Sequence, residues 1–506
     1  MYARLTRLRS PRTWWALVAL CSALVGWGAS SFVRQTEQGF IATGLRSPGQ
    51  GGAAWGLYVA FDVVFVGISF AGITVAALGR LFRVAALEPV TRIAELLTIT
   101  ALVAGACVIV ADLGRPGVGL VNLPEFANPH SPFFGTFTLV VAGYLFSSLV
   151  FFFLAGRADA AALAAADSSG PLACFYRLWA SGYRDTETER RRHRRVSFVL
   201  SLTILPLLVA AHSTLGFIFG IQVGRPGWYG ALQAPGFVVM AGLSGTGVLI
   251  LLVVGLRSLF GLAIPNSAVR WLGNFMWILA AVYLYFITAD ELTAGYASPA
   301  AERHVAAELT EGRFAPLFWM TVVSLLLTAL IPFVLYVRRK TSVGWVVLAA
   351  AVANVAAVLK RFLIVVPSQV EGALLPIERA FYRPSPIEIG IVSGLIALIL
   401  LFILVFARIF PLVPGSHVPH GPESLPQPPD RVRIAVTTSW ALVSTGAIVF
   451  GLLDSFRLFS SGEIDPRVSF SPVIFAAGVM ALFTSAAVYE LFPSQVTKSP
   501  TEIAHL

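Results

Sequence analysis

The chain of 506 residues is 57% hydrophobic and only 12% charged, with a mean hydropathy of +0.79 and a formal net charge of +10. A typical soluble domain contains about 45–50% apolar and about 25% charged residues, so this composition excludes a soluble enzyme. The apolar residues fall in blocks of about 20, which is the length that a helix needs to span a hydrocarbon core of about 30 Å. The sequence therefore predicts an all-α polytopic membrane protein, whose basic residues face lipid headgroups and no nucleic acid.

Twelve membrane-spanning helices are predicted along the chain. An even number of spans places both termini on one side, and the excess of Lys and Arg in the N-terminus and the even-numbered connections, including the run 190–195, puts that side in the cytoplasm. The expected location is the bacterial inner (cytoplasmic) membrane. The predicted spans are 13–33, 54–79, 91–111, 132–155, 196–220, 233–257, 270–289, 314–337, 342–366, 386–410, 433–453 and 469–491.

The first span needs to be distinguished from a signal peptide, because four arginines precede it within the first twelve residues. Its apolar run of about 20 residues exceeds the usual 7–15 of a signal sequence, and no clear small-x-small cleavage site follows. Residues 1–50 are therefore expected to form an N-terminal anchor helix.

A short motif of the form G-[IL]-S-x-x-G occurs twice, at residues 67–72 and 242–247. It fits two parallel four-helix units, and it equally fits small residues that only let helices approach closely. A Pro-rich stretch at residues 411–429 separates the last two spans from the rest and indicates a stiff linker. The predicted division is an anchor (1–50), a first four-helix bundle with the ligand site (51–220), a second bundle (221–366), a tenth helix with its outer loop (367–411), the linker (412–432) and a two-helix appendage (433–506).

Ionisable residues inside apolar spans are the strongest functional indicators, because a membrane excludes charge unless a partner, cavity or proton route receives it. Most of them lie near the outer face, and Glu95 lies one turn into the third span from the cytoplasmic side. The group near the outer face consists of Asp62, Asp112, His212, Lys360 and Arg361.

Each of these residues also has an ordinary structural interpretation. Asp62 fits an ion pair with Lys360 or Arg361, and His212 fits a hydrogen-bonded packing residue. The two cations could reach the outer interface, and Glu95 could lie at the inner headgroups. A functional interpretation is that acid and imidazole groups at one depth suit hydroquinone oxidation, which releases two protons with its two electrons.

The composition also limits the cofactors. The three cysteines contain no CxxC pair, so the chain cannot hold an iron–sulfur cluster alone. Only His212 falls within an apolar span, whereas a haem between helices usually needs two axial side chains. We therefore expect neither haem nor cluster in this chain.

Several loop motifs follow one another in order along the chain. They are Asp112-Leu113-Gly114-Arg115-Pro116, Asn122-Leu123-Pro124, Ser131-Pro132-Phe133, Ala211-His212-Ser213, Pro226-Gly227-Trp228, Ala234-Pro235-Gly236-Phe237, Asp290-Glu291-Leu292, Lys360-Arg361-Phe362 and Tyr382-Arg383-Pro384-Ser385-Pro386-Ile387-Glu388. This ordered series resembles the NrfD/polysulfide reductase membrane-subunit (PsrC-like) family, and more closely its ten-helix branch, which includes the membrane subunits of alternative complex III. The likeness covers roughly residues 50–412.

The resemblance implies a quinone site in the first bundle near the outer face, with menaquinone or ubiquinone as the bound substrate. By motif position, Asp112, Arg115 and His212 are the expected quinone-site residues, with His212 and Asp112 exchanging protons. Asp62 joins them on depth alone, and Asp62 and Glu95 are candidates for a proton relay. The implied partners are a periplasmic, ferredoxin-like iron–sulfur subunit and a catalytic subunit.

One departure from the resemblance concerns the ninth span, where Lys360-Arg361 replaces the Glu-Arg pair that is common in the alternative complex III branch. This change removes a potential proton carrier, so proton translocation is less well supported than quinone binding. The leading hypothesis is a quinone-reactive membrane subunit of a respiratory oxidoreductase, without a redox centre of its own. A secondary transporter and a purely structural anchor stay open as alternatives.

Overall fold

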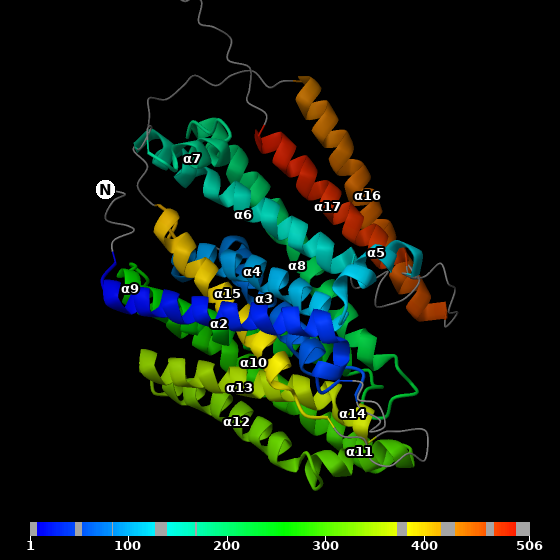
Figure 1. Cartoon of the computed structure of the whole chain (residues 1–506). Helices are drawn as coiled ribbons and strands as arrows, with labels where there is room; N and C mark the ends of the chain where they lie inside the picture. The colour runs from blue at the N-terminus through cyan, green and yellow to red at the C-terminus, as the bar shows by residue number, and fades with distance from the viewer. Residues whose placement is uncertain are drawn as a thin grey trace, which may run out of the picture.

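A computed structural model describes residues 8–45, 53–82, 84–126, 139–166, 170–371, 382–415, 431–461 and 470–491. Over these residues the regular structure is entirely helical (Figure 1). The long helices are α2 (Pro11–Gln38), α3 (Leu57–Leu81), α4 (Thr91–Asp112), α6 (Leu139–Ala166), α8 (Glu187–Gly220), α9 (Gln233–Phe260), α10 (Asn266–Ala297), α12 (Ala315–Val337), α13 (Val343–Val365), α15 (Pro386–Ile409), α16 (Arg431–Ser461) and α17 (Phe470–Leu491).

Eleven helices within the described residues are long and apolar enough to cross a membrane, which confirms a polytopic membrane protein. They match every predicted span except the eleventh, where α16 is a helix of 31 residues that does not count among the eleven. The fourth predicted span, 132–155, was ended too early: α6 continues to Ala166, because the Ala-rich stretch after Phe153 favours helix as strongly as the apolar run before it. Residues 132–138 of that span lie outside the described residues.

Short helices that the hydropathy pattern did not predict cover the ends of the long ones. They are α5 (Pro116–Phe126), α7 (Ala173–Ala180), α11 (Ala300–Thr310) and α14 (Pro367–Val370), with 3-10 turns at Gly39–Ala42 and Ala85–Val90. We call the end of the molecule where α2 begins the proximal end. The opposite end, where α5, α11 and α14 lie, is the distal end (Figure 1).

Helix α3 lies at the centre of the molecule and packs against α4, α8, α9 and α13. Its crossing with α9 brings the two G-[IL]-S-x-x-G motifs into contact. A Cβ atom at Gly245 would lie 2.6 Å from the carbonyl oxygen of Ile68, and one at Gly67 would lie 3.4 Å from the Ser244 hydroxyl. The repeated small residues therefore act as a close helix contact.

The other helices group around this crossing. Among the first predicted unit, α4 packs on α6 and α6 on α8; in the second, α9, α10, α12 and α13 pack on one another. The N-terminal helix α2 pairs with α15, where Gly28 and Gly394 meet so closely that a Cβ atom on either would lie within 3 Å of the other's Cα. The division into domains stays a prediction.

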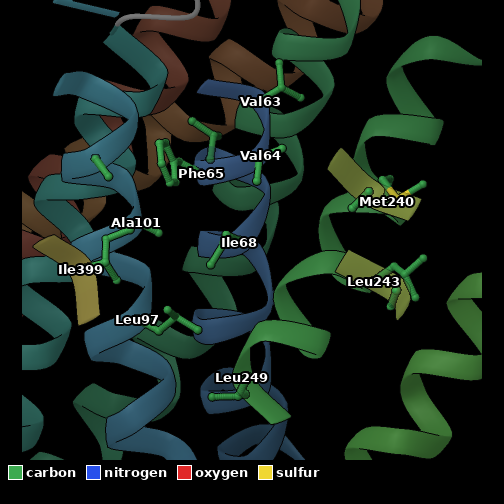
Figure 2. Close-up of a cluster of buried hydrophobic side chains, with 14 of the residues drawn as sticks. Val63, Val64, Phe65, Ile68, Leu97, Ala101, Met240, Leu243, Leu249 and Ile399 are labelled. Atoms are coloured by element: carbon green, nitrogen blue, oxygen red, sulfur yellow. The ribbon is translucent and has the colours of Figure 1, made fainter. Parts of the chain in front are cut away.

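The interior between α3, α4 and α9 is filled with aliphatic and aromatic side chains, as Figure 2 shows. Val63, Val64 and Phe65 of α3 are all less than 7% exposed, as are Leu97 of α4 and Met240 of α9. Because this core surrounds α3 on several sides, polar groups on α3 are held away from lipid and face neighbouring helices.

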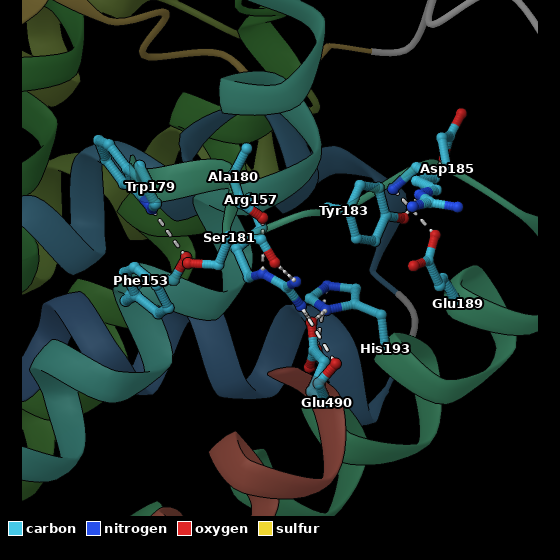
Figure 3. Close-up of polar contacts among 12 residues, drawn as sticks. Phe153, Arg157, Trp179, Ala180, Ser181, Tyr183, Asp185, Glu189, His193 and Glu490 are labelled. Carbon is cyan, nitrogen blue, oxygen red and sulfur yellow. Dashed lines mark hydrogen bonds and ion pairs between the residues drawn. The ribbon is translucent and has the colours of Figure 1, made fainter. Parts of the chain in front are cut away.

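The C-terminal hairpin is part of the folded body and packs mainly through α17. Helix α17 contacts α6 and α8, and α16 covers its other side (Figure 1). Glu490 of α17 forms an ion pair of 3.2 Å with Arg157 of α6, both 3% exposed, and lies 2.9 Å from Nδ1 of His193 (Figure 3).

Candidate functional site

A hydrogen-bond network fixes the start of α3 at the distal end. The Tyr382 hydroxyl accepts a hydrogen bond from the Leu57 amide at 2.7 Å and donates one to the Glu388 carboxylate at 2.5 Å. Glu388 is fully buried and also accepts from the amide of Gly44. Gly56 is required here, because a Cβ atom at this position would lie 2.3 Å from the Tyr382 ring.

A second buried contact joins α2, α3 and α4 just inside this network. Gln35 donates from Nε2 to the carbonyl oxygen of Ala111 at 2.6 Å, and its Oε1 accepts from the hydroxyl of Tyr58. Gln35 and Tyr58 are both fully buried. Their pairing holds the end of α4, where Asp112 follows Ala111, beside the first turn of α3.

Asp62 lies one helical turn below Tyr58 and is 3% exposed. Its carboxylate makes no hydrogen bond or ion pair with any residue that the structure describes. Asp112 is half-buried at the end of α4, close enough for the two carboxylates to repel each other. The structural ion pair of Asp62 with Lys360 or Arg361 is therefore not formed, and that interpretation of Asp62 is wrong.

His212 of α8 lies one further turn inward and contacts the same helix. Its ring nitrogens lie 2.8 Å from the carbonyl oxygens of Leu208 and Val66, and its side chain is 1% exposed. Both partners are acceptors, so a neutral imidazole can donate to only one of them at a time. Val66 follows Asp62 by four residues on α3, so the imidazole and the free carboxylate occupy successive turns.

Polar groups continue inward from His212 along α3. The carbonyl oxygen of Ser69 accepts from Tyr144 of α6 at 2.9 Å and from Thr98 of α4 at 3.0 Å. Gly72 permits this close approach, because a Cβ atom there would lie 2.1 Å from the carbonyl oxygen of Ala94.

At the proximal end this series reaches Glu95, which is 1% exposed and forms an ion pair of 2.6 Å with Arg80. The second oxygen of Glu95 is buried without a hydrogen-bond partner among the described residues. Both side chains line a cavity of about 880 Å³, together with His193 and Glu88. Glu95 is thus held inside the protein by a cation, and the interpretation that it simply lies at the headgroups is wrong.

The remaining predicted residues lie apart from this series. Arg115 is exposed at the distal end, and Gly114 before it has a φ of 71° where α4 ends. Lys360 and Arg361 are buried in α13 at 9% and 2% exposure, so they do not extend to the outer interface. Arg361 stacks on Phe237 at 4.3 Å.

The structure brings Asp62 near Asp112, with His212 one turn further in, whereas the Ser131-Pro132-Phe133 motif lies outside the described residues.

Sequence reasoning did not select Gln35 or Tyr58. Gln35 belongs to the end of the anchor helix, where a polar residue near an interface is unremarkable. Tyr58 precedes Asp62 by four residues, a helical spacing that places both on one face of α3. That spacing is the only signal in the sequence that could have indicated their proximity.

Together, the fold and the buried polar series define a polytopic helical membrane protein. It holds a buried carboxylate, that of Asp62, near the distal end of the helices α3, α4, α6 and α8. The family model described as polysulphide reductase, NrfD, matches residues 47–373. The chain therefore belongs to the NrfD polysulphide reductase family.

Three relatives agree with this assignment. The chain is 29% identical, over 55% of its length, to a putative dimethyl sulfoxide reductase membrane subunit of Halobacterium salinarum, and this match spans 60% of that relative. It is 22% identical, over 75% of its length, to a selenate reductase subunit of Mesobacillus selenatarsenatis, covering 91% of that protein. It is 24% identical, over 80% of its length, to an Hdr-like menaquinol oxidoreductase integral membrane subunit of Archaeoglobus fulgidus, covering 95% of it. The chain is thus the membrane subunit of an oxidoreductase complex.

Proposed function

We propose that this subunit binds a quinone or quinol at the distal end, between α2, α3 and α4, and exchanges electrons with an iron–sulfur subunit docked there. The observation that carries the proposal is the buried, unpaired carboxylate of Asp62. Burying an acid without a partner costs free energy, so its presence inside a membrane span points to a functional role. The name of the Archaeoglobus relative, a menaquinol oxidoreductase subunit, supports menaquinol as the substrate class.

The chemistry requires proton acceptors because oxidation of a hydroquinone yields a quinone, two protons and two electrons. Asp62 and Asp112 place two carboxylates at this end of the protein, and a carboxylate is a suitable acceptor for a quinol proton. The exposed Arg115 lies on the same end and orients the ring or the docked subunit. The electrons leave to the partner, since this chain is not expected to hold a redox centre.

The polar series inward from Asp62 supports proton movement through the first bundle. The next polar side chains toward the proximal end are those of His212, Tyr144 and Thr98. Glu95 then lines the proximal cavity of about 880 Å³. In this proposal His212 carries protons between the carboxylates and the inner groups. The proposed site faces the periplasm and the termini face the cytoplasm, in keeping with the distribution of basic residues.

The experiment is quinol oxidation by the purified complex carrying Asp62→Asn, Asp112→Asn or His212→Ala. Loss of a proton acceptor is expected to lower turnover about 100-fold or more. Arg338→Gln, at the proximal end, is the control. Undiminished turnover in all three variants would exclude this site. Quinone absent from the complex would favour a structural anchor, and substrate uptake by liposomes holding this subunit alone would favour a transporter.

A further inference from the structure

A second, basic pocket lies at the proximal end, remote from the proposed quinone site. It has a volume of about 340 Å³ and opens between the start of α10, the end of α12 and the start of α13. Three cations line it, and its walls are otherwise mainly apolar. The lining residues are Arg270, Gly273, Asn274, Pro332, Leu335, Tyr336, Arg339, Lys340, Thr341, Ser342 and Val346.

The three cations of this pocket lack anionic partners. No ion pair or side-chain hydrogen bond joins Arg270, Arg339 or Lys340 to a residue within the described ranges. The neighbouring Arg257 differs, because it donates to the Asn266 side chain at 2.6 Å. The sequence contains no Asp or Glu between residues 190 and 289 or between 312 and 370, so the charge of the pocket is uncompensated along the chain.

The backbone at Arg339 gives an independent indication. Helix α12 ends in a Schellman motif, in which the amide of Lys340 bonds to Leu335 and that of Arg339 to Tyr336, both at 3.0 Å. Arg339 has a φ of 52° at the position that usually holds Gly. A side chain with a Cβ is disfavoured in this conformation. The arginine side chain is therefore retained at a strained position where Gly would fit better.

The start of α13 adds a further positive element. Its N-cap residue, Ser342, makes no capping hydrogen bond through its side chain. Ser342 belongs to the pocket lining, so the positive end of the α13 dipole also lies there. Tyr336, which is 59% exposed, lines the pocket, and Trp345, which is 55% exposed, lies in the first turn of α13. Exposed aromatic side chains at helix ends commonly mark the headgroup level of a membrane.

We propose that this pocket binds the phosphate of an anionic phospholipid, with the lipid chains against Leu335 and Val346. The positive-inside rule explains basic residues on this side of the membrane, but it requires neither a pocket nor an arginine at a left-handed position. Basic pockets between membrane helices suit anionic headgroups, with each Lys or Arg contributing to the attraction. Free inorganic phosphate is the other source of the same chemistry, without the need for apolar walls.

The test uses the full chain in phosphatidylcholine nanodiscs with increasing fractions of phosphatidylglycerol. Bound lipid is counted by native mass spectrometry, and thermal stability is measured in parallel. We expect phosphatidylglycerol to be retained and to raise the Tm of the wild type. Arg270→Gln and Arg339→Gln should each weaken retention about fivefold, which corresponds to about one phosphate contact per cation.

Two further variants separate the proposal from a general charge effect. Arg338→Gln removes the same charge from the same turn but lies outside the pocket lining, so it should retain the lipid. Arg339→Gly relieves the backbone strain, so it should keep or raise the Tm in pure phosphatidylcholine while losing the response to phosphatidylglycerol. Equal weakening by Arg338→Gln and Arg339→Gln would overturn the proposal, and so would full replacement of the lipid by millimolar inorganic phosphate.

Discussion

Gly105 of α4 provides the space that the carboxylate of Asp62 occupies. A Cβ atom at position 105 would lie 3.3 Å from Oδ1 of Asp62, closer than such contacts normally are. Asp62 has no polar partner among the described residues, and the missing side chain at position 105 leaves its carboxylate the room that it occupies.

Gly105→Ala is therefore expected to displace the Asp62 carboxylate and lower quinol turnover. Alanine is about 1 kcal/mol more favourable than glycine within a helix, but its Cβ atom would also lie 3.3 Å from Cγ2 of Val66, so Tm is measured alongside turnover to separate a displaced carboxylate from a loss of fold. Gly26→Ala is the matched control, since a Cβ atom there meets nothing within 4 Å. Quinol turnover and Tm are measured for both variants. Unchanged turnover in Gly105→Ala would show that quinol oxidation does not depend on the position of Asp62.

The buried pair of Arg80 and Glu95 should respond differently to single and double substitution. Glu95→Gln removes the carboxylate at the proximal end of the polar series, so proton movement by the complex in liposomes should fall. If Glu95 acts only by pairing with Arg80, then Arg80→Gln together with Glu95→Gln should restore proton movement, because no charge is then left unpaired. Continued loss in the double variant supports a relay role.

Tyr382→Phe should destabilise the distal end by about 1–3 kcal/mol, because the Leu57 amide and the Glu388 carboxylate each lose a buried partner. The expected readout is a lower Tm in detergent. Tyr285→Phe, at a side chain 69% exposed, is the control and should leave the Tm unchanged.

The buried hydroxyl of Tyr382 should also make the stability of the protein depend on pH. Burial, and next the charge of Glu388, raise the pKa of Tyr382 above its usual value. The neutral phenol therefore contributes stability that is fully present below about pH 10, the pKa in an unfolded chain, and is lost as the pH rises further. Wild type should lose Tm at alkaline pH more steeply than Tyr382→Phe.

Glu490→Gln should loosen the C-terminal hairpin. It leaves Arg157, which is 3% exposed, without its anionic partner, and such a change typically costs about 3–5 kcal/mol (Figure 3). We expect faster proteolysis at the end of α17, where Glu490 lies, in the isolated subunit. Glu311→Gln, which changes the same charge at the distal end, serves as the control. An unchanged cleavage rate would show that apolar contacts alone hold α17.

Hydropathy along the chain was enough to predict a polytopic membrane protein and the position of most of its helices. Runs of about 20 apolar residues have few alternatives to a membrane helix, because a lipid environment demands that backbone groups pair within the segment. The loop motifs likewise sufficed to indicate the family. The free-energy cost of placing a charge inside a membrane also indicated Asp62 and Glu95 as candidates, because a charged residue within an apolar span is recognised from the sequence without knowing its neighbours.

The contacts that those charged side chains make became known from the folded structure. Hydropathy reports depth along one helix, but it does not report which face of α3 meets α4 or how Gln35 reaches Tyr58 across 23 residues. It could not show that Asp62 is unpaired, that Glu95 is paired with Arg80, or that Arg339 lies in a left-handed turn beside two other cations. These facts depend on side-chain contacts between helices far apart in the sequence, and packing geometry alone sets them.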